Sequence, residues 1–182
     1  MSLTLAERLI AMRTGGTVER CHGVLHYGSY SVAAHSWGVA VLMLLLWPDD
    51  FPRLAIHCVV HDIPEAWVGD IPATTKKFGK GIKAECDRLE SAIFNRLMLP
   101  NDSHLEPEDR EKLKACDKLE LYLWAREQCE AGNMHADCVV CQLDDFFKED
   151  PLPARAHQLY SEVRRMSVQH RTDGLIKELC RS

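Results

Sequence analysis

Four side chains that can bind a metal lie in segments that are otherwise apolar. His35 falls inside one apolar segment, the adjacent pair His61 and Asp62 closes a second, and Asp117 lies on the apolar face of a predicted helix. A buried carboxylate without a partner is costly and tends to become protonated. Two imidazoles and two carboxylates can instead satisfy one another by binding a divalent cation, and this donor set suits Mn, Co, Fe, Ni or Zn. The sequence therefore predicts one buried metal site formed by these four residues.

Two further spacings look like parts of a metal site. His57 precedes His61 by four residues, but its apolar neighbours and the missing Glu of a His-Glu-x-x-His motif favour a core histidine. Cys138 and Cys141 follow His135 and form half of a zinc pattern, yet a second pair at suitable spacing is lacking in the sequence. We favour structural roles for both groups, and metal binding stays open as the alternative.

The elements that must position these residues are predicted to be helices. Apolar residues recur with a helical period, convincing strand alternation is missing, and Thr4 with Glu7 fits a capping box. The predicted helices run from Thr4 to about Gly16 and over residues 32–47, 52–62, 82–98, 107–131, 134–148 and 154–180, with loops at 17–30 and 69–81. We expect an all-α fold, a helical bundle that forms a single domain over residues 1–182.

Composition excludes several classes of protein. The chain has 182 residues, of which 46% are hydrophobic and 27% charged, so neither a disordered nor a collagen-like chain is expected. Lys and Arg number 22 against 27 Asp and Glu, a net charge of −5. An acidic chain is poorly suited to sequence-independent duplex binding, so we expect no stable nucleic-acid partner. A small anionic ligand in a local basic pocket remains compatible with this charge.

The sequence also carries indications of location. The N-terminal residues MSLTLAERLIAMR lack the basic-then-apolar layout of a secretory signal. The apolar segment 32–47 is too short for a comfortable membrane span and contains His35, so we expect a core helix and no membrane association. With eight cysteines and no signal peptide, free thiols in a reducing cytoplasm are expected.

The ordered motifs resemble the HD phosphohydrolase superfamily. The pattern is carried by Val18-Glu19-Arg20, His35-Ser36, the segment His61-Asp62-Ile63-Pro64-Glu65-Ala66-Trp67-Val68-Gly69-Asp70-Ile71-Pro72, and Asp117-Lys118. Within the superfamily it resembles bacterial HD-domain 5′-deoxynucleotidases, and at least as closely the small phage dATP triphosphohydrolases. The resemblance covers about two-thirds of the chain, from residue 17 to residue 125.

The resemblance implies a role for each matching residue. It makes His35, His61, Asp62 and Asp117 the ligands of one divalent transition metal per chain. It places Glu65 as the carboxylate that orients or deprotonates water, Asp70 as a second acid near the sugar and the water, and Arg20 and Lys76 near the phosphates. Cys21 stands where the bacterial nucleotidases have a Trp that lines the nucleoside pocket. Independently, Glu65 follows His61 by four residues, so a helix would place it beside the metal.

The resemblance implies a phosphohydrolase of 2′-deoxynucleotides. We favour a dNTP triphosphohydrolase that gives deoxynucleoside and triphosphate, because Lys118 beside Asp117 adds a cation for a longer phosphate chain. A 5′-deoxynucleotidase, a cyclic-nucleotide or alarmone hydrolase and a non-catalytic nucleotide sensor are the alternatives. Family members are homo-oligomers, so assembly is expected on the resemblance. The location would be the cytoplasm, or the host cytoplasm for a phage-encoded chain.

Overall fold

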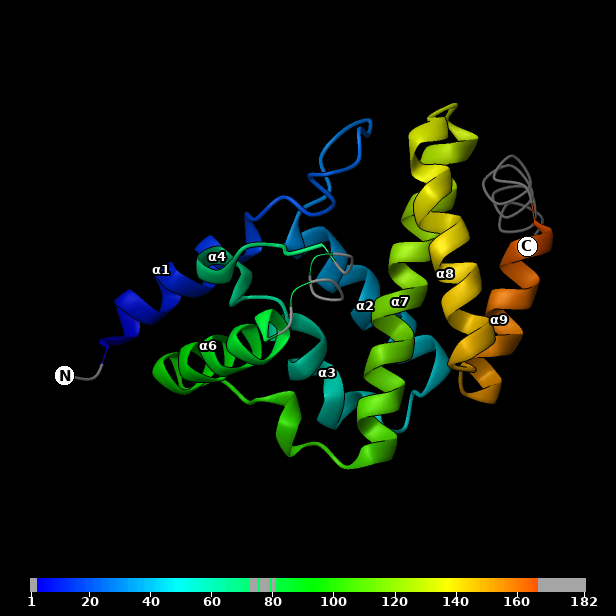
Figure 1. Cartoon of the computed structure of the whole chain (residues 1–182). Helices are drawn as coiled ribbons and strands as arrows, with labels where there is room; N and C mark the ends of the chain where they lie inside the picture. Colours follow the sequence, from blue (N-terminus) through cyan, green and yellow to red (C-terminus); the bar gives the residue numbers. More distant parts are fainter. Residues whose placement is uncertain (1–2, 73–74, 76–78, 80, 167–182) are drawn as a thin grey trace, which may run out of the picture.

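The computed structural model of the chain describes residues 3–72, 75, 79 and 81–166, and it is built of helices (Figure 1). Within these residues the only extended pairing is an isolated bridge between Glu19 and Ser31, so the predicted all-α class is confirmed. The α-helices are α1 (Leu5–Gly16), α2 (Val32–Leu46), α3 (Phe51–Val60), α4 (Glu65–Val68), α6 (Ile82–Leu97), α7 (Pro107–Glu130), α8 (Asp137–Glu149) and α9 (Ala154–Arg165), and short 3-10 helices cover Asp102–His104 and Met134–Ala136.

Helix α2 lies at the centre, against both α3 and α7 (Figure 1). It begins after Ser31, whose hydroxyl accepts the N–H of Ala34 at 3.3 Å, and it contains no Asp, Glu, Lys or Arg. Its buried side chains join those of α3 and α7 in the main core, which includes Val39, Met43, Leu54, Cys116 and Leu119. This packing places His35, near the start of α2, against the middle of α7.

Helix α3 ends two residues earlier than the sequence predicts, at Val60. Pro64 lacks an N–H and its ring would clash with the carbonyl of Val60, so the helix cannot continue through it. Residues 61–64 form a turn instead, and α4 starts at Glu65. His61 caps α3, with its N–H donating to the carbonyl of His57 at 3.1 Å, and Asp62 follows it on the turn.

Helix α1 supports that turn. The predicted capping box is present, since the hydroxyl of Thr4 accepts the Glu7 N–H at 3.2 Å and the Glu7 carboxylate accepts the Thr4 N–H at 2.7 Å. At the other end of α1, a Cβ on Gly15 would lie 2.9 Å from the backbone oxygen of Ile63. Glycine thus allows α1 to lie directly against the turn that carries His61 and Asp62.

The C-terminal helices α8 and α9 cover the outer side of α7 (Figure 1). The helix predicted over 134–148 begins as a 3-10 turn, and α8 proper starts at Asp137. The helix predicted over 154–180 ends at Arg165, because Met166 is extended. Residues 167–182 lie outside the described part of the chain, so the single domain over 1–182 stays a prediction for the full length.

None of the described helices combines the length and the apolar character that crossing a bilayer requires. The seven cysteines that the structure describes carry free thiols, as the sequence predicts. Cys58 and Cys116 are fully buried and pack in the core, as small apolar side chains do.

Candidate metal centre

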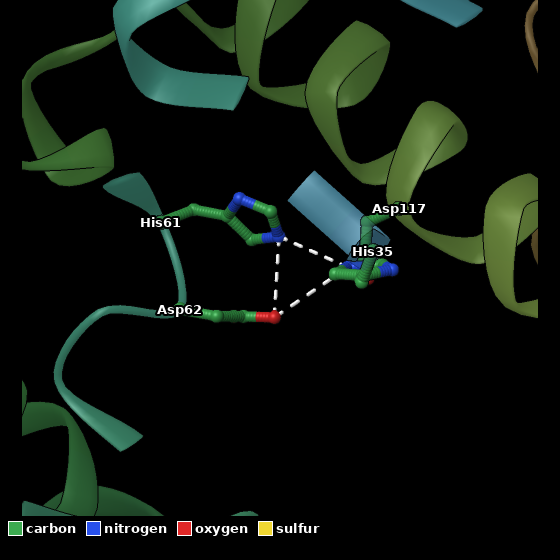
Figure 2. A group of neighbouring side chains, drawn as sticks. All are labelled: His35, His61, Asp62 and Asp117. Carbon is green, nitrogen blue, oxygen red and sulfur yellow. Dashed lines mark hydrogen bonds and ion pairs between the residues drawn. The ribbon is translucent and has the colours of Figure 1, made fainter. Parts of the chain in front are cut away.

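The four predicted metal ligands converge on one point. Each of His35, His61, Asp62 and Asp117 offers one ligand atom, and these atoms lie within 4.8 Å of one another. Figure 2 shows the side chains pointing toward a common centre, His35 from α2, His61 and Asp62 from the turn after α3, and Asp117 from α7. No other group of three or more His, Cys, Asp or Glu in the described residues meets the same criterion.

Both imidazoles direct their Nε2 atom toward this centre. Nε2 of His35 lies 3.2 Å from Nε2 of His61 and 3.2 Å from Oδ1 of Asp117, while Nε2 of His61 lies 3.3 Å from Oδ2 of Asp62. Nδ1–H of His61 donates to the carbonyl of Cys58 at 3.0 Å, and Nδ1–H of His35 donates to the Glu120 carboxylate. A neutral imidazole with its proton on Nδ1 keeps the Nε2 lone pair for a metal.

This donor set fits a divalent transition metal. Two imidazole nitrogens and two carboxylate oxygens face one another at contact distance, and all four are electron-pair donors. A shared cation resolves their mutual repulsion, and mixed nitrogen and oxygen ligands suit Zn, Mn, Fe, Co or Ni.

The charges of these neighbouring side chains shift one another's pKa values. Burial opposes the charged form of His61, but the carboxylate of Asp62 outweighs it and raises the pKa of His61 to about 9. Burial also opposes the charged form of Asp117, yet Lys118 and His35 hold the pKa of that carboxyl well below its usual range. The carboxylates are therefore ionised, and a metal would displace protons from the imidazoles when it binds.

Arg20 lies directly over the carboxylates of the centre. Its Nη1 donates to Asp62 and lies 3.5 Å from Oε1 of Glu65, and its Nη2 lies 3.9 Å from Oδ1 of Asp117. The side chain is 9% exposed. Burial opposes its charge, but Asp62 and Asp117 raise the pKa of Arg20 above its usual value. A permanent cation with a fork of donors thus lies beside the predicted ligands, and its phosphate-binding role stays a prediction.

Glu65 opens helix α4 next to the centre. Its side chain is 16% exposed, and Oε2 is buried without a hydrogen-bond partner among the residues described. Burial, reinforced by the neighbouring Asp62 carboxylate, raises the pKa of Glu65 to about 8. The ionised form of this group, which is populated near pH 8, offers an oxygen free of protein donors that can accept a proton from water.

Asp70 and Cys21 are joined by a backbone hydrogen bond. The N–H of Cys21 donates to Oδ2 of Asp70 at 2.7 Å, which ties the 17–30 loop to the segment after α4. Cys21 has φ of 54°, a left-handed conformation that non-glycine residues seldom adopt. Burial raises the pKa of the Cys21 thiol to about 12, so the thiol is neutral rather than nucleophilic.

Of the two lysines predicted near the phosphates, the structure describes Lys118. Nζ of Lys118 donates to Oδ2 of Asp117 at 2.9 Å, and its side chain is 32% exposed, so it lies at the rim of the centre. Lys76 lies outside the described residues.

The other metal candidates have structural contacts instead. Nδ1 of His57 lies 2.6 Å from Oδ1 of Asp102, which links α3 to the 3-10 helix Asp102–His104. Cys138 and Cys141 are both exposed, and their thiols donate to the carbonyl of His135 and to Asp137. Neither group belongs to the metal-type cluster.

Two side chains beside the centre were not anticipated. Glu120 accepts a hydrogen bond from His35, and the hydroxyl of Tyr30 donates to the same carboxylate oxygen. Glu120 follows Asp117 by three residues on α7, a spacing that places both on one helical face but does not by itself show that Glu120 contacts His35. Tyr30 lies in a loop without periodicity, where the sequence offered no signal.

Comparison with known proteins is consistent with this geometry. A family model described as "5'-deoxynucleotidase YfbR-like" matches residues 9–154. The chain is 32% identical to the dATP triphosphohydrolase of Salmonella phage PMBT28, over 54% of this chain and 56% of that protein. It is 28% identical to the 5′-deoxynucleotidase of Shewanella oneidensis, over 53% of this chain and 56% of that protein. The chain thus spans little more than half the length of these curated relatives.

A solved structure shares the fold. The HD phosphohydrolase of cyanophage S-2L, determined with dA and one catalytic Zn²⁺ ion bound, has a TM-score of 0.63 and 19% sequence identity. The likeness covers 90% of this chain and 97% of that one. It establishes a common helical architecture.

Proposed function

The chain belongs to the YfbR-like family of HD phosphohydrolases, and from that premise we propose that it is a metal-dependent phosphohydrolase of 2′-deoxynucleotides. The observation that carries the proposal is the buried, unpartnered Oε2 of Glu65 beside the group of His35, His61, Asp62 and Asp117. A site that only bound nucleotide would not need a proton acceptor in that position.

Each group has a part in hydrolysis. A divalent metal held by the four ligands would act as a Lewis acid toward a phosphate oxygen and lower the pKa of water. Arg20 would hold phosphate oxygens in its fork, since its guanidinium already lies against the ligand carboxylates. Glu65 would accept the proton of the attacking water at Oε2. Asp70, fixed by the N–H of Cys21, would orient the water or the sugar.

Within this class we favour a deoxynucleoside triphosphate as substrate. Lys118 lies at the rim with Nζ beside Asp117, so it adds a second cation to that of Arg20. A triphosphate carries up to about four negative charges and gains more from this second cation than a monophosphate does. Water would attack the α-phosphorus and give a proton to Glu65, the bond to O5′ would break, O5′ would take up a proton, and deoxynucleoside and triphosphate would leave. The phage dATP triphosphohydrolase among the relatives supports dATP as the first choice.

Hydrolysis of deoxynucleoside monophosphates is the second candidate. It is favoured by the description of the matching family model and by the relative from Shewanella oneidensis. The same metal, Arg20 and Glu65 would serve, and the products would be deoxynucleoside and orthophosphate.

The remaining parts of the proposal concern cofactor and setting. We propose one divalent transition metal per chain, of which the zinc of the cyanophage protein is one example. The partner is a small-molecule deoxynucleotide rather than a nucleic acid. Assembly into a homo-oligomer and a location in the cytoplasm, or in the host cytoplasm, belong to the same proposal.

One experiment tests the function. Purified protein loaded with Mn²⁺, Co²⁺ or Zn²⁺ is incubated with deoxy- and ribonucleoside mono-, di- and triphosphates, and the products are identified by chromatography. We expect deoxyadenosine and intact triphosphate from dATP. Orthophosphate from dNMPs alone would select the 5′-deoxynucleotidase, and no turnover of any nucleotide by the metal-loaded protein would select a sensor.

A further inference from the structure

The ring of His35 is held from the side that faces away from the metal centre. Nε2 faces His61 and Asp117 at 3.2 Å, and Nδ1–H on the opposite side donates to Oε2 of Glu120. His35 is fully buried, so water cannot replace this acceptor. The Tyr30 hydroxyl lies 3.2 Å from the same Nδ1, so Glu120 is the charged one of two neighbours there and the one that favours the Nδ1–H tautomer, which directs the Nε2 lone pair to the centre.

Glu120 is itself held in place by Tyr30. The Tyr30 hydroxyl donates to the same Oε2 that accepts from His35. Tyr30 is 3% exposed, and its ring stacks on Trp124 with centroids 4.4 Å apart and planes 10° from parallel. Trp124 lies one turn after Glu120 on α7. An aromatic stack thus fixes the hydroxyl, and the hydroxyl fixes the carboxylate.

Gly38 provides the space for this carboxylate. A Cβ at Gly38, one turn after His35 on α2, would lie 2.5 Å from Cγ and 2.9 Å from Oε1 of Glu120. Glycine inside a helix is less stable than alanine, so a side chain is absent here at a cost to α2. The cost is explained if the Glu120 carboxylate has to occupy that position.

We propose that Glu120, fixed by Tyr30 and accommodated by Gly38, is the positioning residue of His35 and sets the affinity and geometry with which the centre holds its metal. The inference rests on the proposed metal centre and goes beyond it. Glu120 acts through His35 and contacts neither metal nor substrate. Removing an outer carboxylate of this kind typically weakens metal binding by about 10- to 100-fold.

The test is a Co²⁺ titration of the whole chain in competition with a chelator. The dissociation constant and the visible absorption of bound Co²⁺ are measured for the wild type, Glu120→Gln, Gly38→Ala and the control Glu111→Gln. Glu111 is an exposed residue of the same helix α7. Circular dichroism and the metal-free melting temperature report whether each variant is folded.

We expect Glu120→Gln to weaken Co²⁺ binding about 10-fold or more and to change its absorption bands, because the amide lacks the charge that polarises His35. Gly38→Ala should do the same although it leaves Glu120 in the sequence, and Glu111→Gln should match the wild type. A purely structural role would lower only the melting temperature.

Two outcomes would overturn the inference in different ways. Equal Co²⁺ affinities and spectra for the wild type, Glu120→Gln and Gly38→Ala would remove the role of Glu120 and leave the metal centre standing. A wild type that binds no Co²⁺ would overturn the centre itself, and the inference with it.

Discussion

Arg20 donates a hydrogen bond to Asp62, so the predicted phosphate-binding residue touches a predicted metal ligand directly. The two residues are 42 positions apart and come from the 17–30 loop and the turn after α3. The backbone N–H of Arg20 donates to the carbonyl of Tyr30 at 2.8 Å, which fixes the loop at this point. A phosphate bound by Arg20 would consequently lie within reach of the metal.

Arg20→Lys should separate charge from geometry. Lysine keeps the positive charge but loses the planar fork, so one of two charge-assisted hydrogen bonds to phosphate is lost. Such a bond is worth about 1.5–3 kcal/mol, so kcat/KM should fall about 10- to 100-fold. Steady-state kinetics check this, with Arg13→Lys on α1 as the control. Unchanged kcat/KM would place phosphate binding elsewhere.

Glu65→Gln should bind metal and nucleotide normally but lose turnover by about 10²-fold or more. The amide has nearly the shape of the carboxyl group but cannot accept a proton from water. Metal content, nucleotide affinity and single-turnover rates are compared with those of Glu85→Gln, an exposed position on α6. Full turnover in Glu65→Gln would assign the base to another residue, and Asp70 would be the first to examine.

Lys118→Ala should distinguish phosphate chains by length. Removing this rim cation is expected to raise KM about fivefold for dATP and less than twofold for dAMP, since an ion pair at a partly exposed site contributes about 1 kcal/mol. Lys114→Ala, at an exposed position of the same helix, serves as control. An equal rise in KM for both nucleotides would count against the triphosphate preference.

Acid should weaken the ion pair that joins Arg53 on α3 to Asp109 on α7. Arg53 donates to both oxygens of the buried Asp109, and this hydrogen bonding lowers the pKa of Asp109 below its usual 3.8. A lowered pKa in the folded state stabilises the fold above the unfolded pKa, and this stabilisation is lost as the pH falls through the folded pKa.

The Asp109→Asn variant measures this contribution. At pH 7 its free energy of unfolding should be about 1–2 kcal/mol lower than that of the wild type. The difference should shrink as the pH falls below about 4. Urea titrations at several pH values test this, with the exposed Asp49→Asn as control. A difference that stayed constant from pH 7 to pH 2 would contradict the assignment.

The ligand set could be predicted from the sequence because polar groups are costly on apolar faces. His35 and Asp117 stand out within the apolar pattern of α2 and α7, and His61 with Asp62 ends that of α3. The helices themselves were predicted from the same spacing of apolar residues. The helix ends were predicted less accurately. Helix α3 ends at Val60, four residues before Pro64, and helix α9 ends at Arg165 because the backbone of Met166 is extended.

The residues that surround the metal ligands and hold them in place could not be predicted in the same way. A glutamate such as Glu120 on a long charged helix is ordinarily a solvated residue, and only the crossing of α2 over α7 brings it to His35. Tyr30 and the left-handed Cys21 lie in an irregular loop, where side-chain direction depends on tertiary contacts. The need for glycine at position 38 is explained only by the Glu120 side chain that packs against it.

Metal analysis after purification and reconstitution tests the central claim most directly. The wild type should hold about one divalent metal per chain, and His61→Ala and Asp117→Ala should hold much less. His57→Gln, a buried histidine of α3 that contacts Asp102, should retain the metal even if it lowers stability. A wild type as empty as both ligand variants, or a loss of metal in His57→Gln alone, would contradict the four-residue centre.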